Sequence, residues 1–165
     1  MQQFYAEAVP AANKALDDLA KANGVTIKSY ERTNVDGRDD LAKHFMLSAA
    51  IAAYADTALA DAIGLYKEIE DARSGSGFSF NDLAADRAGT TFGEKAVAGV
   101  APAGQLQHRV AAGVQDTDLM PPWRDLPESL PEPVFRQRFG GVDAPAYRAM
   151  MQEIEQRVAA LRVLR

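Results

Sequence analysis

The chain has 165 residues, a net charge of −5 and no cysteine. Its length fits a single domain over residues 1–165, and its content of 47% hydrophobic and 25% charged residues is typical of globular proteins. The negative charge, without a basic run among aromatics, argues against nucleic-acid binding. The absence of cysteine excludes disulfides, thiolate metal ligands and a cysteine nucleophile or lipid anchor in this sequence.

The first helix is expected within residues 3–23, where apolar residues recur at helical spacing. Pro10 indicates that the regular helix begins there, because proline is tolerated in a first turn, and Gly24 ends it. Residues 25–27 (Val-Thr-Ile) have the composition of a strand, but they lack an evident partner strand, so we expect an extended loop. No secretory signal precedes this pattern, so an exported form would have to have lost its signal.

Residues 38–56 are predicted to form the central, buried helix, because apolar residues and alanines surround it on nearly every side. The apolar stretch 45–65 is about long enough to cross a bilayer. It contains Asp56 and Asp61, however, and an aspartate at the membrane centre costs roughly 2.5–3.5 kcal/mol. We therefore predict buried helix here and no transmembrane segment.

Three more helices are predicted before the proline-rich region. The first covers 58–72, and a Ser-Gly-Ser-Gly run then breaks the chain. Ser79 and Asp82 have the spacing of a capping box for the next helix, which should extend to about residue 98. The third is expected over 103–115, with its valines and Leu106 on one side. Residues 39–98 thus form the predicted core helices.

The last part of the chain is predicted to contain a surface arm and a terminal helix. Prolines recur between 121 and 133, which excludes a long helix, so residues 119–141 should wrap the domain with Trp123 and Leu126 as anchors. Glycines at 140 and 141 should end a short helical turn. Asp143 is expected to cap the C-terminal helix, over 143–164. The predicted fold class is an all-α, compact helical bundle around a buried central helix.

Polar residues gather on one face of each predicted core helix. At 100° per residue, His44 shares a face with Ser48 among apolar neighbours. The other two faces are Asp61, Gly64, Glu68 and Asp71, and then Asp82, Asp86, Gly89 and Gly93.

The two glycines of the last face predict a close helix contact. A glycine inside a helix costs about 1 kcal/mol relative to alanine, so a pair on one face indicates that another backbone approaches closely. Asp82 and Asp86 beside them would then be partly buried. A buried carboxylate needs a partner, because an unpaired buried charge costs several kcal/mol.

His44, Glu68, Asp82 and Asp86 are the candidate catalytic residues, and three interpretations stay open. In the first they are a structural network in which carboxylates pair with His44 and Arg73. In the second they converge on a pocket, where one imidazole and several carboxylates suit a divalent metal or general acid–base chemistry. In the third a helix kink misplaces one face. The sequence matches no established catalytic or metal-binding motif.

The same segment resembles a known family. Its parts are Lys-His-Phe at 43–45, Gly-Leu-Tyr-Lys-Glu at 64–68 with Asp71, and Asp-Leu-Ala-Ala-Asp at 82–86 with Gly89. This order is similar to that of YfiM-like proteins, which are predicted bacterial periplasmic lipoproteins. The resemblance covers about a third of the chain, residues 40–93. The chain departs from the family in lacking a cysteine for lipidation.

The resemblance implies a bacterial cell-envelope protein in the periplasm, in a soluble form, and it implies no settled activity. Two hypotheses follow. The first is a non-catalytic accessory or interaction module, with an envelope protein or a small molecule as partner and the arm around Trp123 as a partner surface. The alternative is a small hydrolase that uses a divalent metal or a carboxylate pair on an envelope substrate. The sequence leaves open whether the protein is an enzyme, and it gives no oligomeric state.

Overall fold

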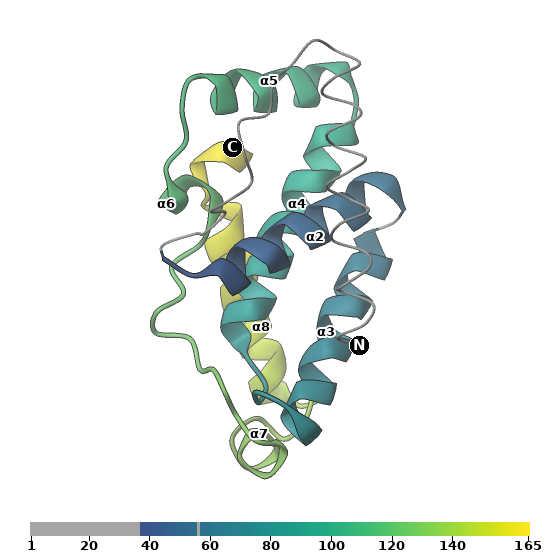
Figure 1. Ribbon diagram of the computed structural model, residues 1–165, viewed down its shortest axis with the longest axis vertical. Coiled ribbons are helices and arrows are strands. Elements are labelled where there is room, and N and C mark those ends of the chain that lie inside the picture. The colour runs from purple at the N-terminus through teal and green to yellow at the C-terminus, as the bar shows by residue number, and fades with distance from the viewer. Residues whose placement is uncertain (1–36, 56) are drawn as a thin grey trace. The chain divides into compact units, whose positions relative to one another are not determined.

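The computed structural model describes residues 37–55 and 57–165, and this part of the chain is all-α, as predicted (Figure 1). The predicted helix within 3–23 and the loop at 25–27 lie outside the described residues. That the whole chain is one domain therefore stays a prediction. The elements are α2 (Asp39–Tyr54), α3 (Thr57–Ser74), α4 (Phe80–Val97), α5 (Val100–Ala111), α6 (Asp116–Leu119), α7 (Glu132–Phe139), α8 (Pro145–Ala159) and the 3-10 helix η1 (Arg162–Leu164).

Helix α4 lies at the centre of the bundle. It packs against α2, α3, α5 and α8, and α2 crosses it at an angle in Figure 1. The expectation that 38–56 is the central helix is therefore corrected. Phe45 and Ala52 of α2 are buried as expected, but Met46 and Tyr54 are exposed, so α2 buries one face only. The alanines and glycines of α4 explain its position, because small side chains let other helices approach it closely.

The contact between α2 and α4 depends on two glycines. A Cβ atom added at Gly89 would overlap the backbone carbonyl of Phe45, and one at Gly93 would overlap the carbonyl of Ala49. The backbones of the two helices are thus in direct contact at both positions. This confirms the close approach predicted from the glycines, and it fixes how far apart the residues of α2 and α4 can lie.

The apolar stretch 45–65 is divided between two helices. Helix α2 ends at Tyr54 and α3 begins at Thr57. Among the residues that the structure describes, no helix is both long enough and apolar enough to cross a membrane, which agrees with the prediction for this stretch.

The proline-rich segment runs along the helices and is anchored as predicted. Leu126 and Leu130 are buried, and Trp123 is partly buried. The amide of Phe80 donates to the carbonyl of Pro127 at 2.9 Å, and Phe78 pairs with Leu130 in an isolated antiparallel bridge. The arm therefore closes over the N-terminal end of α4.

Aromatic rings hold the arm, α7 and α8 against that end of α4. The rings of Phe78 and Phe135 stack with centroids 4.1 Å apart, and Phe80 lies 4.7 Å from Phe139. Tyr147 of α8 packs on the same group. Phe78 and Phe80 flank Ser79, so this packing also fixes the start of the helix that carries Asp82.

The predicted boundaries of two helices are wrong. The C-terminal helix expected over 143–164 ends at Ala159, and a separate 3-10 helix covers Arg162–Leu164. The helix expected over 103–115 is α5, and it begins at Val100 after Gly99, whose φ of +132° is accessible to glycine. Gly113, with φ of +95°, follows the end of α5, so Val114 lies outside it. In the last helix, Ala144 rather than Asp143 takes the N-cap position, because Pro145 fits the first helical turn without needing a donor.

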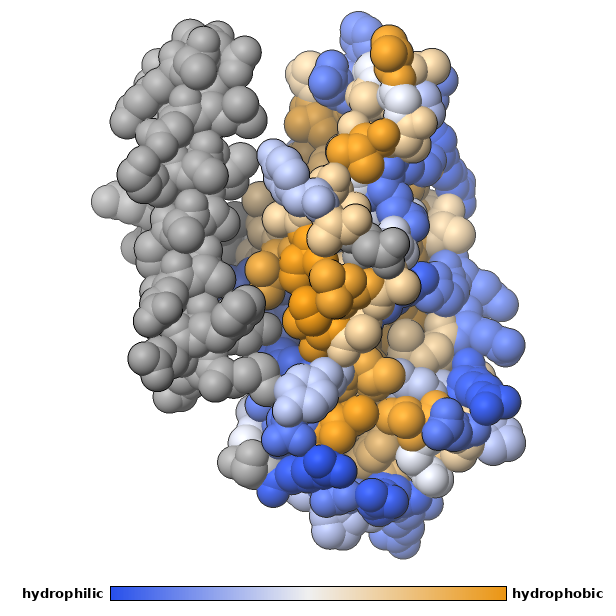
Figure 2. Space-filling model, turned by 90° about the vertical axis from the view of Figure 1, so that its right-hand side faces the viewer, coloured by the Kyte–Doolittle hydropathy of each residue, from blue (hydrophilic) through white to orange (hydrophobic). Residues whose placement is uncertain are grey.

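Other predicted ends are confirmed. The Ser79 hydroxyl accepts a hydrogen bond from the amide of Asp82 at 3.2 Å, as an N-cap of α4 should. Gly140 ends α7 in the left-handed conformation. Figure 2 shows one face on which hydrophobic residues lie between hydrophilic ones, and the exposed apolar side chains of the described part include Tyr54, Tyr66 and Val100.

Candidate functional site

His44 and two aspartates join α2 to α4. The His44 Nδ1 atom lies 3.0 Å from Oδ1 of Asp86, and Nε2 lies 3.2 Å from Oδ2 of Asp82. The hydroxyl of Ser48, one turn after His44, donates to the same Asp86 oxygen at 2.8 Å. Because Asp82 and Asp86 are one turn apart in α4, both carboxylates reach the same imidazole from opposite sides.

Lys67 and Glu68 extend this cluster to α3. The ammonium of Lys67 lies 2.8 Å from Oε1 of Glu68, 3.1 Å from Oδ2 of Asp82 and 2.8 Å from Oδ2 of Asp71. The other oxygen of Glu68 accepts a hydrogen bond from the amide of Ser79 at 2.7 Å. The cluster therefore connects three helices and the N-cap of α4. We call His44, Lys67, Glu68, Asp71, Asp82 and Asp86 the charged cluster.

The pKa values of the histidine and lysine are raised. Burial by itself would lower the pKa of His44, but the hydrogen bonds to Asp82 and Asp86 outweigh this effect and raise it to about 10. Burial would likewise lower the pKa of Lys67, whereas Glu68, Asp71 and Asp82 raise it above its usual range. In the ion-free protein both groups therefore carry a positive charge at neutral pH.

The two carboxyl groups nearest Lys67 shift in opposite directions. Burial, and the negative charge of Asp82, raise the pKa of Glu68 to about 7 although Lys67 and the Ser79 amide act against this shift. Burial would raise the pKa of Asp82 as well, but His44 and Lys67 hold it well below its usual range. Asp82 is thus ionised at neutral pH, whereas Glu68 gains or loses its proton close to neutral pH.

The carboxylate of Asp86 lies directly against Gly64 in the α3–α4 interface. A Cβ atom at Gly64 would lie 2.6 Å from Oδ2 of Asp86. That oxygen is buried and has no hydrogen-bond partner among the described residues. Because Gly64 has no side chain, the Asp86 carboxylate can lie against α3, just as Gly89 lets the carbonyl of Phe45 lie against α4.

The structure brings all four candidate residues together, and it changes their predicted partners. Arg73 pairs with Glu70 on the surface of α3, so the prediction that it neutralises the cluster is wrong. Lys67 neutralises the carboxylates in its place. Asp61, expected on the same face as Glu68, pairs instead with Arg87. The ion pair between Lys67 and Asp71 could have been predicted from the sequence, because the two residues are one helical turn apart.

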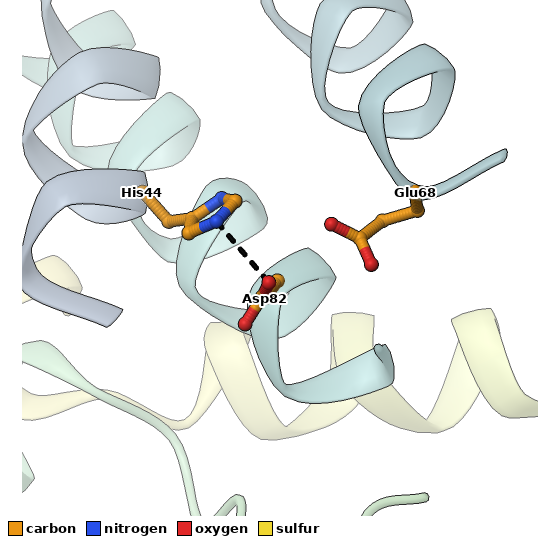
Figure 3. A group of neighbouring side chains, drawn as sticks. All are labelled: His44, Glu68 and Asp82. Carbon is orange, nitrogen blue, oxygen red and sulfur yellow. Dashed lines mark ion pairs between the residues drawn. The ribbon is translucent and has the colours of Figure 1, made fainter. Parts of the chain in front are cut away.

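Three residues of the cluster have the chemistry to hold a metal ion. His44, Glu68 and Asp82 each offer one ligand atom, and these atoms lie within 4.8 Å of one another. Figure 3 shows the carboxylate of Glu68 on α3 turned toward the His44–Asp82 pair. Imidazole nitrogen and carboxylate oxygen together suit a borderline divalent ion such as Zn²⁺ or Mn²⁺.

Three carboxylates of the cluster are buried, whereas Lys67 and Asp71 are partly exposed at its edge. Glu68 is completely buried, and Asp82 and Asp86 are 8% and 4% exposed. Two cavities of about 230 and 300 Å³ lie elsewhere on the described part, the first beside Arg109 and Arg162 and the second beside Phe78 and Phe135. No atom of Glu68 is therefore exposed to a substrate in this arrangement.

Comparison of the chain with models of protein families, with curated proteins and with solved structures found no match.

Proposed function

We propose that this protein is a bacterial cell-envelope protein of the periplasm that acts as a non-catalytic accessory or interaction module. In this proposal the charged cluster holds α2, α3 and α4 together. The observation that carries it is the complete burial of Glu68, whose two oxygens are bound by Lys67 and by the Ser79 amide. A general acid or base must come within hydrogen-bond distance of its substrate, and no atom of Glu68 is exposed to one in this arrangement.

The proposed location rests on the resemblance to YfiM-like proteins. The segments that carry this resemblance contain every member of the charged cluster. The charged cluster would explain why these segments occur in this order, because α2, α3 and α4 must each supply charged residues to one network.

The partner surface that we propose is the arm around Trp123. The guanidinium groups of Arg38 and Arg124 lie 5.2 and 4.8 Å from the Trp123 ring, and Arg38 also pairs with Glu128 of the arm. Tryptophan and arginine are the residues that most often dominate binding energy at protein interfaces. A partly buried ring in contact with two cations is therefore a suitable anchor for another protein.

A small hydrolase that uses a metal or a carboxylate pair is the second candidate. The proximity of His44, Glu68 and Asp82 favours it, since the same three side chains could position a metal-bound water. It would require a substrate to reach Glu68, which is completely buried in this arrangement.

Complementation of a deletion strain separates the two candidates. The strain would carry wild type, Glu68→Gln or Asp82→Asn, with envelope integrity measured as detergent sensitivity and protein folding checked by melting temperature. A non-catalytic module predicts that every variant that stays folded restores resistance. A folded Glu68→Gln protein that fails to restore it would favour the hydrolase. Fractionation of the wild-type strain tests the periplasmic location.

A further inference from the structure

We propose that the charged cluster binds one divalent transition-metal ion, such as Zn²⁺ or Mn²⁺, through Nε2 of His44 and one carboxylate oxygen each of Glu68 and Asp82. This inference rests on the proposed non-catalytic function, because the ion would help the charged cluster to hold the three helices together. The three ligands come from α2, α3 and α4, and all three side chains are nearly or completely buried. An ion there would link three helices at one point, and with three protein ligands it would keep a further position for a water molecule.

The distances between the ligand atoms are close to those that an ion needs. Ligands at about 2.1 Å from one ion lie at most about 4.2 Å apart. The ligand atoms of His44, Glu68 and Asp82 lie within 4.8 Å of one another, and the His44–Asp82 pair is already at 3.2 Å. A small rotation of the Glu68 side chain, which points toward the other two, would complete the set (Figure 3).

Asp86 supports His44 in the way that carboxylates support metal-binding histidines. In such sites the ring nitrogen that does not bind the metal donates its proton to a carboxylate, which fixes the tautomer and the orientation of the ring. Here Nδ1 of His44 donates to Asp86, and the Ser48 hydroxyl holds the same oxygen in place. Nε2 is thereby left to face Asp82 and Glu68.

The cluster contains more negative than positive charge. Its four carboxylates are Glu68, Asp71, Asp82 and Asp86, and its two cations are Lys67 and His44. Independently, Asp86 is more than nine-tenths buried, and its Oδ2 atom, directed at Gly64 in the same interface, has no partner in the part of the chain described. Uncompensated negative charge inside a protein is costly, and a divalent ion would supply what the side chains lack.

Lys67 is the competitor of the ion. Its ammonium contacts the two carboxylates that the ion would use, Glu68 and Asp82, and it also contacts Asp71. When an ion binds, Lys67 can keep Asp71, one helical turn along α3, and give up the other two. Removal of the Lys67 charge should therefore strengthen metal binding. In a cluster that binds no ion, the same change would only remove one of its two cations and weaken the ion pairs.

The test is a titration of chelator-treated full-length protein with Zn²⁺, Mn²⁺ and Mg²⁺ by calorimetry. The variants are Lys67→Met, Glu68→Gln and Asp82→Asn, with Lys43→Met as the matched control, because Lys43 is exposed on α2 next to His44. Nitrogen NMR of the histidines provides a second readout, since coordination shifts Nε2 of His44 and leaves the Nδ1 proton in place.

We expect wild type to bind one Zn²⁺ or Mn²⁺ per chain, with a shifted signal of His44 Nε2. The Kd should be at least tenfold lower in Lys67→Met and unchanged in Lys43→Met. It should be at least tenfold higher in Glu68→Gln and Asp82→Asn. Wild type and Lys67→Met that both stay folded and bind none of the three ions would overturn the metal site. An ion that binds without moving the His44 signal would overturn it too. Neither result would affect the proposed non-catalytic role, which the complementation experiment tests separately.

Discussion

The imidazole of His44 and the carboxylate of Asp86 are 42 positions apart in the chain, and their nearest atoms lie 3.0 Å apart in the α2–α4 interface. This contact depends on glycines as much as on the two partners. Gly89 lets the backbones of α2 and α4 meet, and Gly64 leaves room for the second oxygen of Asp86 against α3. The polar contacts between these helices therefore depend on the small residues that let the helices approach each other.

Gly89→Leu should destabilise the protein by at least about 2 kcal/mol, because the new side chain would overlap the carbonyl of Phe45 on α2. Urea unfolding measures the change. Gly104→Ala is the matched control, since a Cβ atom at this position of α5 meets nothing within 4 Å. It should be neutral or stabilise by up to about 1 kcal/mol through helix propensity. Equal stability of Gly89→Leu and wild type would mean that α2 and α4 are not in backbone contact.

Gly64→Ala should cost about 1–3 kcal/mol in wild type, because its methyl group would lie against Oδ2 of Asp86. In an Asp86→Ala background the cost should fall, since the clashing carboxylate is absent. The double-mutant cycle over these two positions should give a coupling energy of at least about 0.5 kcal/mol. Additive effects would show that Gly64 and Asp86 do not meet.

Chelator-treated protein should lose stability as the pH rises, and His44→Ala should lack part of this dependence. The folded pKa of His44, about 10, lies above the unfolded value near 6.5. Its stabilisation is thus complete below about pH 6.5 and disappears as the pH rises through 10. At pH 6, His44→Ala should cost roughly 1–3 kcal/mol through the unsatisfied aspartates, measured by urea unfolding.

The control for this experiment is His108→Ala, because His108 is exposed on α5 and outside the charged cluster. It should leave the pH profile of wild type unchanged. A profile of His44→Ala that parallels wild type from pH 6 to 10 would contradict the ion pairs of His44.

Glu68→Gln should remove a second decline in stability, between about pH 4.5 and 8. The folded pKa of Glu68, about 7, is raised above the ordinary value of 4.5. The contribution of this group is therefore greatest below pH 4.5, where both states are protonated, and it is lost as the pH rises through 7. Glutamine imitates the neutral acid at every pH, so the variant should become more stable relative to wild type above pH 7. Urea unfolding at pH 5 and 8, with chelator present, tests this, and Glu70→Gln on the same helix is the control.

The sequence by itself determined the helices and the faces that carry the charged cluster. Alanine-rich, periodic segments predict helix locally, and the Ser79 cap and the Gly140 stop act within a few residues, so these features could be read from the chain. The glycine pair of α4 also predicted a close helix contact, because glycine within a helix has a cost that packing must offset. Errors occurred where neighbouring residues decide the boundary. Asp143 was predicted to cap the last helix, but Pro145 determines where this helix starts.

Only the tertiary structure decided which helix is central and which cation neutralises the carboxylates. Burial and ion pairing depend on where three helices meet, and helical periodicity fixes each face without fixing its partner. Lys67 and Arg73 are equally good cations in the sequence, yet one lies in the interface and the other on the surface. The choice follows from which face of α3 meets α4, and that face carries Lys67, whereas Arg73 pairs with Glu70 outside the interface.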